Sequence, residues 1–146
     1  MENVDKNEGV LHHCYGCGPM NPIGLKLEVR QEGESAVAEY IPGENHEGWP
    51  GVVHGGVTCA LLDEIMGYVP YFLHLRTVTG KLNVEFRSPL RAHERIYLKA
   101  VPLRITKRMI AVKGTVHDEH HQLLASANAD MVILNERQLK EVGILL

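Results

Sequence analysis

One segment of this sequence has the pattern of a long helix, and it is the only convincing one of that length. Residues 54–69 read HGGVTCALLDEIMGYV, with apolar side chains near helical spacing and no run of β-branched residues. Pro70 follows, so we expect the helix to end or kink near Val69, with one extra turn over residues 71–75. A single long helix has to bury its apolar side chains against other elements, and the remaining sequence predicts strands.

The segments on both sides of this helix alternate polar and apolar residues, which is the period of a half-buried strand. Strands are predicted over residues 25–30, 34–41, 77–87, 95–105, 109–117 and 122–133, and a short terminal helix over residues 136–142. One long helix with about six mostly antiparallel strands is an α+β arrangement in which the sheet covers the helix. One such sheet cannot cover all of the helix and its own far face, so we expect a second subunit.

The length of the chain, 146 residues, suits one domain. We expect that domain over residues 25–146, preceded by a lead-in over residues 1–24 that contains the ordered loop CYGCGPMNPIG. Residues 1–13 are expected to be flexible. No apolar run is long enough to span a bilayer, and the first residues are polar and acidic, unlike a signal peptide. We therefore expect a cytoplasmic protein that does not enter a membrane.

The net charge of −3 hides an uneven distribution of charged residues. Residues 76–113 hold ten basic and two acidic side chains, whereas the remainder of the chain is strongly acidic. A basic block in an acidic protein indicates a specific anionic ligand, with solvated strand faces as the alternative. Nucleic acid is not expected as a partner, because the block lacks regularly interleaved aromatic stacking platforms and the whole chain is acidic.

The spacing of Gly56 and Asp63 constrains how these two residues can cooperate. On a helix they share a face but are separated by about 10 Å along the axis, and His54 lies on roughly the opposite face from Asp63. If the glycine N–H and the carboxylate act on the same atom, they must therefore come from different chains. Small residues surround the acid at helical spacing: Gly56, Ala60, Asp63 and Gly67. Such a stripe lets another backbone or a ligand approach closely, although a tightly packed helix with an exposed aspartate is the alternative.

The Gly55-Gly56 pair has a direct chemical use at a helix start. The first N–H groups of a helix lack intrahelical partners and lie at the positive end of the helix dipole. They can polarise a carbonyl oxygen in the manner of an oxyanion hole. The alternative is that the two glycines only make a sharp turn.

Three segments of the chain together resemble one enzyme family. The segment GWPGVVHGGVTCALLDEIMG resembles the central signature of the hotdog-fold thioesterases of the PaaI-like branch, which carries HGG at the helix start and an acid nine residues after the histidine. The segment TGKLNVEFRSPL resembles the third strand of that family, and the opening CYGCGPMNPIGLKLEV resembles a lead-in found in part of the branch. The resemblance implies a hotdog fold, in which a mostly antiparallel sheet of about six strands wraps one long central helix.

The resemblance also implies an acyl-CoA thioesterase that hydrolyses a thioester to free CoA and a carboxylic acid. Asp63 matches the catalytic carboxylate, which acts as nucleophile or as general base on water. The backbone N–H of Gly56, with that of Gly55, would polarise the carbonyl, and His54 would be mainly positional. Thr79 matches a position where relatives place a serine or threonine to orient the water or intermediate, with an ordinary strand threonine as the alternative.

The basic block is the natural place for the CoA group of the substrate. The candidate substrate-binding residues are Asn83, Glu85, Arg87, Lys107 and Arg108. Arginine offers bidentate contacts to phosphate and lysine a point charge. The candidates for shaping the acyl pocket are Trp49, Tyr68, Tyr71 and Phe72. We expect a homodimer with composite active sites, with a tetramer as an alternative, and no cofactor beyond the CoA of the substrate.

Two other functions compete with hydrolysis. Some hotdog dehydratases, or enoyl-CoA hydratases, use a histidine loop that His46 and the residues after it superficially resemble. The helix acid expected at the spacing of that family would fall on Ala60, which argues against this function. The second alternative is an acyl-CoA-binding protein without turnover, and the intact Asp63 argues against it.

The lead-in loop also has the residue types of a zinc site, in His12, His13, Cys14 and Cys17. A Cys-x-x-Cys pair supplies only half of the usual four ligands, and adjacent histidines ligate one metal awkwardly. We therefore expect no metal, with both cysteines packing as small apolar groups. Cys59 brings the number of cysteines to three, which cannot all pair within one chain, and this favours a reducing compartment.

Overall fold

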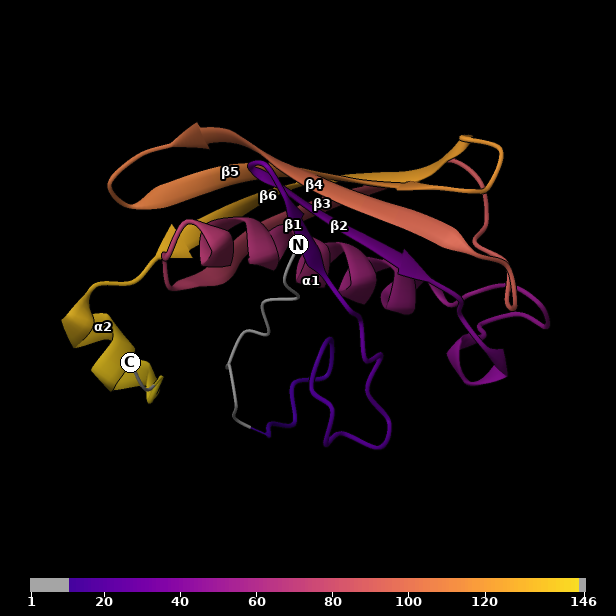
Figure 1. Cartoon of the computed structure of the whole chain (residues 1–146), viewed down its shortest axis with the longest axis horizontal. Coiled ribbons are helices and arrows are strands. Elements are labelled where there is room, and N and C mark those ends of the chain that lie inside the picture. Colours follow the sequence, from indigo (N-terminus) through magenta and orange to yellow (C-terminus); the bar gives the residue numbers. More distant parts are fainter. Residues whose placement is uncertain (1–10, 145–146) are drawn as a thin grey trace.

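The computed structural model describes residues 11–144 and confirms the α+β class (Figure 1). Its elements are β1 (Arg30–Glu32), β2 (Ser35–Tyr40), η1 (Glu44–His46, a 3-10 turn), α1 (Gly55–Phe72), β3 (Thr77–Phe86), β4 (Ile96–Ile105), β5 (Met109–His117), β6 (Leu123–Ile133) and α2 (Glu136–Val142). Most of the lead-in predicted to be flexible, residues 1–13, lies outside the described residues. No helix in the described part of the chain is long and apolar enough to cross a membrane.

All six strands form one sheet in the order β1-β2-β4-β5-β6-β3, and every neighbouring pair is antiparallel. The sheet covers one side of α1, and the N-terminal loop lies on the other side of the helix (Figure 1). The strand that follows the helix, β3, is an edge strand of ten residues. Since the edge of a sheet presents a row of unpaired backbone N–H and C=O groups, this is where the sheet can be extended.

The hydrophobic core lies between α1 and the inner face of the sheet. The helix contributes the fully buried side chains of Leu61, Leu62, Ile65, Met66 and Val69. The central strands contribute Ala100, Ile110, Val112, Val116 and Ala125, which are equally inaccessible. Each large apolar side chain buried in this way stabilises the fold by about 1.5–3 kcal/mol. Gly114 on β5 allows the helix to approach closely, because a Cβ at that position would lie 2.9 Å from Met66 Cγ.

The segment over residues 25–30 differs most from the strand expected there. Its apolar residues are buried in alternation, as predicted, but β1 begins only at the last residue of the range. The cause is Lys26, whose φ of 54° takes the backbone out of the strand conformation. The N–H groups of the residues on either side of Lys26 donate to the carbonyls of Tyr15 and Gly16, at 2.7 and 2.8 Å. This segment therefore pairs with the lead-in loop in place of the sheet.

The end of the long helix lies further along the chain than predicted. We expected an end or kink near Val69, but α1 continues through Pro70 to Phe72. Proline removes one intrahelical hydrogen bond, and because Pro70 lies in the last turn of the helix only one further turn follows that loss. The Pro70 carbonyl still accepts the N–H groups of Leu73 and Leu75, at 3.1 and 2.9 Å. The extra turn that we predicted is thus the last turn of α1 and its C-cap.

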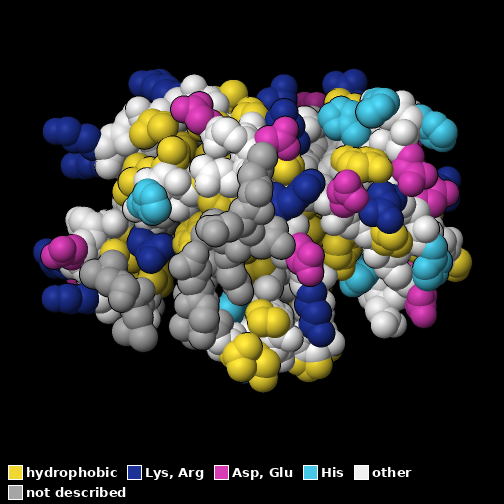
Figure 2. All heavy atoms as spheres, viewed as in Figure 1, with side chains coloured by type: hydrophobic (Ala, Val, Ile, Leu, Met, Phe, Trp, Pro, Cys, Tyr) yellow, Lys and Arg dark blue, Asp and Glu magenta, His cyan; other side chains and the backbone are white. Residues whose placement is uncertain are grey.

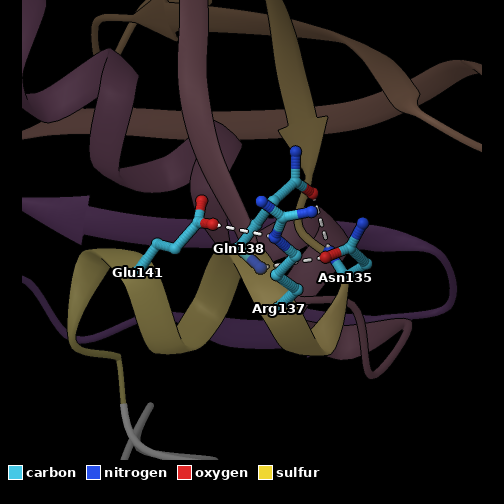
Figure 3. A network of polar contacts seen from close by, with 4 residues as sticks. All are labelled: Asn135, Arg137, Gln138 and Glu141. Atoms are coloured by element: carbon cyan, nitrogen blue, oxygen red, sulfur yellow. Dashed lines mark hydrogen bonds and ion pairs between the residues drawn. The ribbon is translucent and has the colours of Figure 1, made fainter.

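The terminal helix α2 is confirmed over its predicted range, and reciprocal capping holds its start (Figure 3). The Asn135 side chain accepts the Gln138 N–H at 2.9 Å, and the Gln138 side chain accepts the Asn135 N–H at 3.0 Å. Arg137 Nε donates to Glu141 Oε1 at 2.9 Å on the exposed side of the helix. Such capping stabilises a seven-residue helix that buries little apart from Leu139.

Candidate active site

Asp63 lies in the middle of α1 and is only partly buried. Its Oδ1 accepts a hydrogen bond of 2.7 Å from Thr79 Oγ1, which reaches it from β3. The register of β3 against β6 shifts directly after Thr79, between Thr79 and Lys81, so Gly80 forms a β-bulge. Bulges re-aim side chains and are common beside active sites. The structure therefore brings together Asp63 and Thr79, which we proposed from the sequence as two separate site residues.

Asp63 and Thr79 open onto a cavity of about 360 Å³. The other residues around it include Gly67, Tyr71, Arg76, Thr77 and Met131. Gly67 carries no side chain, which leaves room beside the acid. Arg76 brings a positive charge, with its guanidinium carbon 5.8 Å from the centre of the Tyr71 ring. A carboxylate, a hydroxyl group and a cation thus share one open cavity.

The Gly55-Gly56 pair forms the first turn of α1, with His54 as its N-cap. His54 Nδ1 accepts the Gly56 N–H at 2.8 Å, so the imidazole engages the group that we expected to polarise a carbonyl. A nitrogen that accepts this bond is unprotonated. The Gly55 N–H has no acceptor among residues 11–144, and this glycine is exposed. Gly55 is therefore the more accessible donor of the two.

The start of α1 opens onto a second cavity, of about 250 Å³. Gly55 lines it from the helix, and Phe86 and Arg87 line it from the end of β3. Within residues 11–144, this cavity shares no lining residue with the one at Asp63. Gly56 and Asp63 are seven positions apart in the helix, which corresponds to about 10 Å along α1. Within one chain the glycine pair and the carboxylate therefore cannot act on the same atom.

The basic residues predicted to bind CoA do not form one cluster within the chain. Arg87 directly follows β3, whereas Lys107 and Arg108 lie in the turn between β4 and β5. The Arg108 carbonyl accepts the N–H of Ile133, whose strand partner is Thr77 at the start of β3. A ten-residue strand is about 33 Å long, so Arg87 lies far from the other two. Figure 2 likewise shows Lys and Arg side chains spread over the visible face and not gathered in one patch.

The other two predicted CoA-binding residues, Asn83 and Glu85, also lie apart from both cavities. They are exposed on β3 and alternate with Leu82 and Val84, which pack against the hydrophobic core. Because successive strand residues point to opposite faces, Asn83 and Glu85 project from the outer face of the sheet. They line neither the cavity at Asp63 nor the cavity at Gly55.

Glu64 also lines the cavity at Asp63, and we assigned it no role from the sequence. It is only 9% exposed, and its carboxylate oxygens lie 3.8 and 3.9 Å from the Cys14 sulfur. Cys17 is equally buried, and the pKa of its thiol is raised by a hydrogen bond with Cys14, by burial and by the charge of Glu64. The sequence signal that could have found this cluster is a glutamate in a buried position of a helix, which normally requires a partner.

The aromatic candidates for an acyl pocket divide between several environments. Of the four, Tyr71 alone lines the cavity at Asp63. Tyr68 and Phe72 are buried in the core, and Trp49 is 80% exposed in the loop before α1. Arg76 is a lining residue that we did not predict. Its position between the end of α1 and the start of β3 was the available signal, since both elements border this cavity.

The family model of the thioesterase superfamily matches residues 50–125, which include all of α1 and β3. A solved thioesterase superfamily protein is 24% identical over 90% of this chain and 70% of its own, with a TM-score of 0.79. A hypothetical thioesterase from Streptococcus pneumoniae, solved with coenzyme A, is 16% identical over 75% of this chain and 86% of its own, with a TM-score of 0.71. Zebra fish thioesterase superfamily member 2 is 21% identical over 75% and 82% of the two chains, with a TM-score of 0.69. A comparison with curated proteins gives no match.

The strand order around a single long helix and these structural matches define the architecture as the hotdog fold. Since the family model covers more than half of the chain, the chain belongs to the thioesterase superfamily. By class it is therefore a thioester hydrolase. The assignment to the PaaI-like branch stays a prediction.

Proposed function

We propose that this chain is an acyl-CoA thioesterase that hydrolyses its substrate to free CoA and a carboxylic acid. The observation that carries the proposal is the hydrogen bond of 2.7 Å from Thr79 to Asp63, beside an open cavity of about 360 Å³. A carboxylate that is held by a hydroxyl group and open to solvent suits attack on a carbonyl carbon, directly or through water.

Solved relatives support both the ligand and the pair of residues. The Streptococcus pneumoniae protein was solved with coenzyme A, and a Streptococcus mutans relative was solved with acetyl-CoA. In further structures of the Streptococcus pneumoniae protein, an aspartate and a threonine sixteen positions apart are each replaced by alanine. Asp63 and Thr79 have the same order and the same separation of sixteen.

Asp63 can act on a thioester in two ways. As a general base it takes a proton from water while the water oxygen attacks the carbonyl carbon, and the tetrahedral intermediate then expels the CoA thiolate, which receives the proton. As a nucleophile its oxygen attacks the carbon and expels the thiolate, and water later cleaves the mixed anhydride to restore the carboxylate. In both routes Thr79 holds one carboxylate oxygen, so the other oxygen acts on the substrate.

The N–H groups at the start of α1 would polarise the thioester carbonyl. The Gly55 N–H is accessible, whereas the Gly56 N–H becomes accessible only when the His54 imidazole turns away. One such donor to a developing oxyanion accelerates acyl transfer by about 10²–10³-fold.

A second copy of the chain would bring the two cavities together. An antiparallel pair of β3 strands, joined at their free edges, would place the start of one strand beside the end of the other. Thr79 and Asp63 lie near the start of β3, whereas Gly55 and Arg87 lie near its end. In such a dimer the carboxylate of one subunit would face the glycine amides of the other.

The same pairing would gather basic residues that are far apart in one chain. Arg87 of one subunit would approach Arg76, Lys107 and Arg108 of the other, because these residues lie at opposite ends of β3. Together they would supply the positive charge that the phosphates of CoA require. We therefore keep the three predicted basic residues as CoA contacts and add Arg76.

Hydrolysis of short, long and aromatic acyl-CoAs, followed by the release of free thiol, tests the proposed function. The wild type should release thiol from at least one class, and Asp63→Asn should bind CoA in calorimetry without releasing thiol. Crotonyl-CoA hydration, measured in parallel, distinguishes the hydratase alternative. Hydration without thiol release, or binding of all three classes without any reaction, would contradict a hydrolase.

The composite site is tested by mixing two inactive variants, Asp63→Asn and Gly55→Pro. Proline suits the first helical position and removes only the N–H of Gly55. In a heterodimer one composite site carries both changes and the other carries neither. Random subunit exchange makes half of the dimers mixed, so activity should return to about one quarter of the wild-type value. No recovery in a mixture that demonstrably exchanges subunits would contradict a site shared between chains.

A further inference from the structure

The cluster of Cys14, Cys17 and Glu64 has the dimensions of a metal site. One ligand atom from each residue can be chosen so that all three lie within 4.8 Å of one another, with the Cys14 sulfur 3.8 Å from Glu64 Oε1. Zinc binds sulfur at about 2.3 Å and carboxylate oxygen at about 2.0–2.2 Å, so neighbouring ligand atoms of a tetrahedral site lie about 3.5–3.8 Å apart. The cluster is thus already close to the size that a zinc ion requires.

The backbone around the cluster is built so that the carboxylate can reach the two thiols. A Cβ on Gly16 would overlap the Glu64 carboxyl group, and a Cβ on Gly18 would overlap the Cys14 backbone. The Gly18 N–H donates to the Cys14 carbonyl at 2.8 Å and closes the turn that carries both cysteines. Gly16 is therefore required by the tight approach of this loop to α1, and Gly18, directly after Cys17, by the tight turn of the loop itself.

The burial of the cluster also suits a bound cation. Cys17 and Glu64 are each about 9% exposed, whereas Cys14 is only partly buried. Two thiolates and a carboxylate in such a site would repel one another, and a divalent cation would compensate their charges. Thiolate ligands select zinc over magnesium or calcium. Since Cys14 keeps the cluster open on one side, a water molecule can occupy the fourth position.

We propose that Cys14, Cys17 and Glu64 bind a zinc ion that fastens the lead-in loop to α1. The sequence alone had argued against a metal, because only the two thiols were evident as a ligand pair. Glu64 supplies a third donor from fifty residues further along the chain. Because Glu64 directly follows Asp63 and lines the same cavity, the ion would fix the helix one residue from the candidate catalytic acid.

Metal analysis of the tag-free full chain, purified without chelator, tests this site. We expect about one zinc ion per chain, bound with an affinity in the range of structural sites with cysteine ligands. Replacement of zinc by cobalt(II) should give the intense visible bands of a tetrahedral ion and a sulfur-to-cobalt charge-transfer band. A metal-free chain that takes up neither ion in a competition titration against a chelator would overturn the proposal. A Cys14–Cys17 disulfide in protein purified under reducing conditions would overturn it as well.

Three variants separate ligands from bystanders. Cys17→Ser and Glu64→Gln should each lower zinc affinity by about a hundredfold or more, since even changes outside the direct ligands cost 10–100-fold. Cys59→Ser is the matched control, because this cysteine lies on α1 outside the cluster, and it should keep full metal content. Zinc retained by the first two, or lost by the control, would contradict the assignment. If a variant fails to fold, the cobalt spectrum of the wild type still decides.

Discussion

Asp63 and Glu64 are neighbours on α1 and both line the same cavity, yet their carboxylates have different partners. Asp63 is partly exposed, accepts a hydrogen bond from Thr79 and faces a cavity. Glu64 is 9% exposed and faces two thiols beneath the lead-in loop. One helical step turns a side chain by about 100°. That rotation is enough to leave the Asp63 carboxylate partly exposed to solvent, whereas the Glu64 carboxylate contacts the lead-in loop of the same chain.

The difference teaches that catalytic and structural effects should separate cleanly at these two positions. An accessible carboxylate contributes little to the free energy of folding, because water solvates it in the unfolded chain almost as well as the protein does in the folded one. A buried carboxylate contributes through its partners, and removal of a partner leaves a polar group without compensation. Changes around Asp63 should therefore alter rates, whereas changes around Glu64 should alter stability.

The largest expected effect is that of Asp63→Asn. The amide keeps the size of the side chain but can neither take a proton from water nor attack a carbonyl, so kcat should fall by about 10²–10⁴-fold. Tm, measured by calorimetry, should remain close to the wild-type value. Glu64→Gln is the contrasting variant, with a lowered Tm and a smaller loss of kcat. Equal rate losses at both positions would remove the distinction between them.

The start of α1 should give the next largest effect. Gly55→Pro removes one N–H donor and should lower kcat by about 10²-fold or more. Gly55→Ala is the control, because it keeps the N–H and its Cβ would meet the Phe86 ring at an ordinary distance of 3.8 Å. Equal kcat values for the proline and alanine variants would exclude Gly55 as the donor. The Gly56 N–H would then remain as the candidate donor to the oxyanion. His54→Ala should make this N–H accessible, because it removes the imidazole that accepts its hydrogen bond.

Much of this site could be predicted because its signals are local. The period of α1, the strands around it and the position of Asp63 all follow from short stretches of sequence. The partners of these residues could not be predicted, since Cys14 and Glu64 are fifty residues apart and meet only after the loop has folded onto the helix. The separation of Arg87 and Arg108 could not be predicted either. Both belong to the basic block of the sequence, but they lie at opposite ends of β3 in the folded chain.

Thr79→Val should have a smaller effect than either change above. A hydrogen bond to a charged group contributes about 1.5–3 kcal/mol, which corresponds to a loss of about 10–10²-fold in kcat. Thr79→Ser keeps the hydroxyl group and should retain most of the activity. The two variants together distinguish the loss of the bond to Asp63 from the loss of packing, and an inactive serine variant would favour packing.

On the Glu64 side, Gly16→Ala tests how tightly the lead-in loop packs on α1. The new Cβ would overlap the Glu64 carboxyl group, and overpacking of this kind costs about 1–3 kcal/mol. For a chain of this size that corresponds to a Tm loss of about 3–10 °C. Gly43→Ala is the matched control, because its Cβ would meet nothing within 4 Å. A Tm loss shared by both variants would show that the effect does not come from the loop contact.

A third carboxylate, Asp118, supplies the baseline for the other two and the smallest expected effect. It lies in the turn between β5 and β6, where its Oδ1 accepts the N–H groups of His120 and Gln122 at 2.8 and 2.9 Å. The Gln122 N–H is the main cause of a lowered pKa of Asp118, and the His120 N–H adds to it. Because the folded chain favours the ionised form, this stabilisation is present above the ordinary pKa of an aspartate and disappears as the pH falls through the lowered value.

The corresponding measurement compares Asp118→Ala and Asp118→Asn with the wild type across acidic pH. At neutral pH the alanine variant should be less stable than the wild type, by less than Gly16→Ala, since the turn is exposed and screened by solvent. An asparagine oxygen can still accept both N–H groups, so the asparagine variant should lie between the two. The gap between asparagine and wild type should close as the pH falls, because protonation removes the charge from the wild type alone. A gap that stays constant with pH would mean that the charge of Asp118 contributes nothing to the stability of this exposed turn.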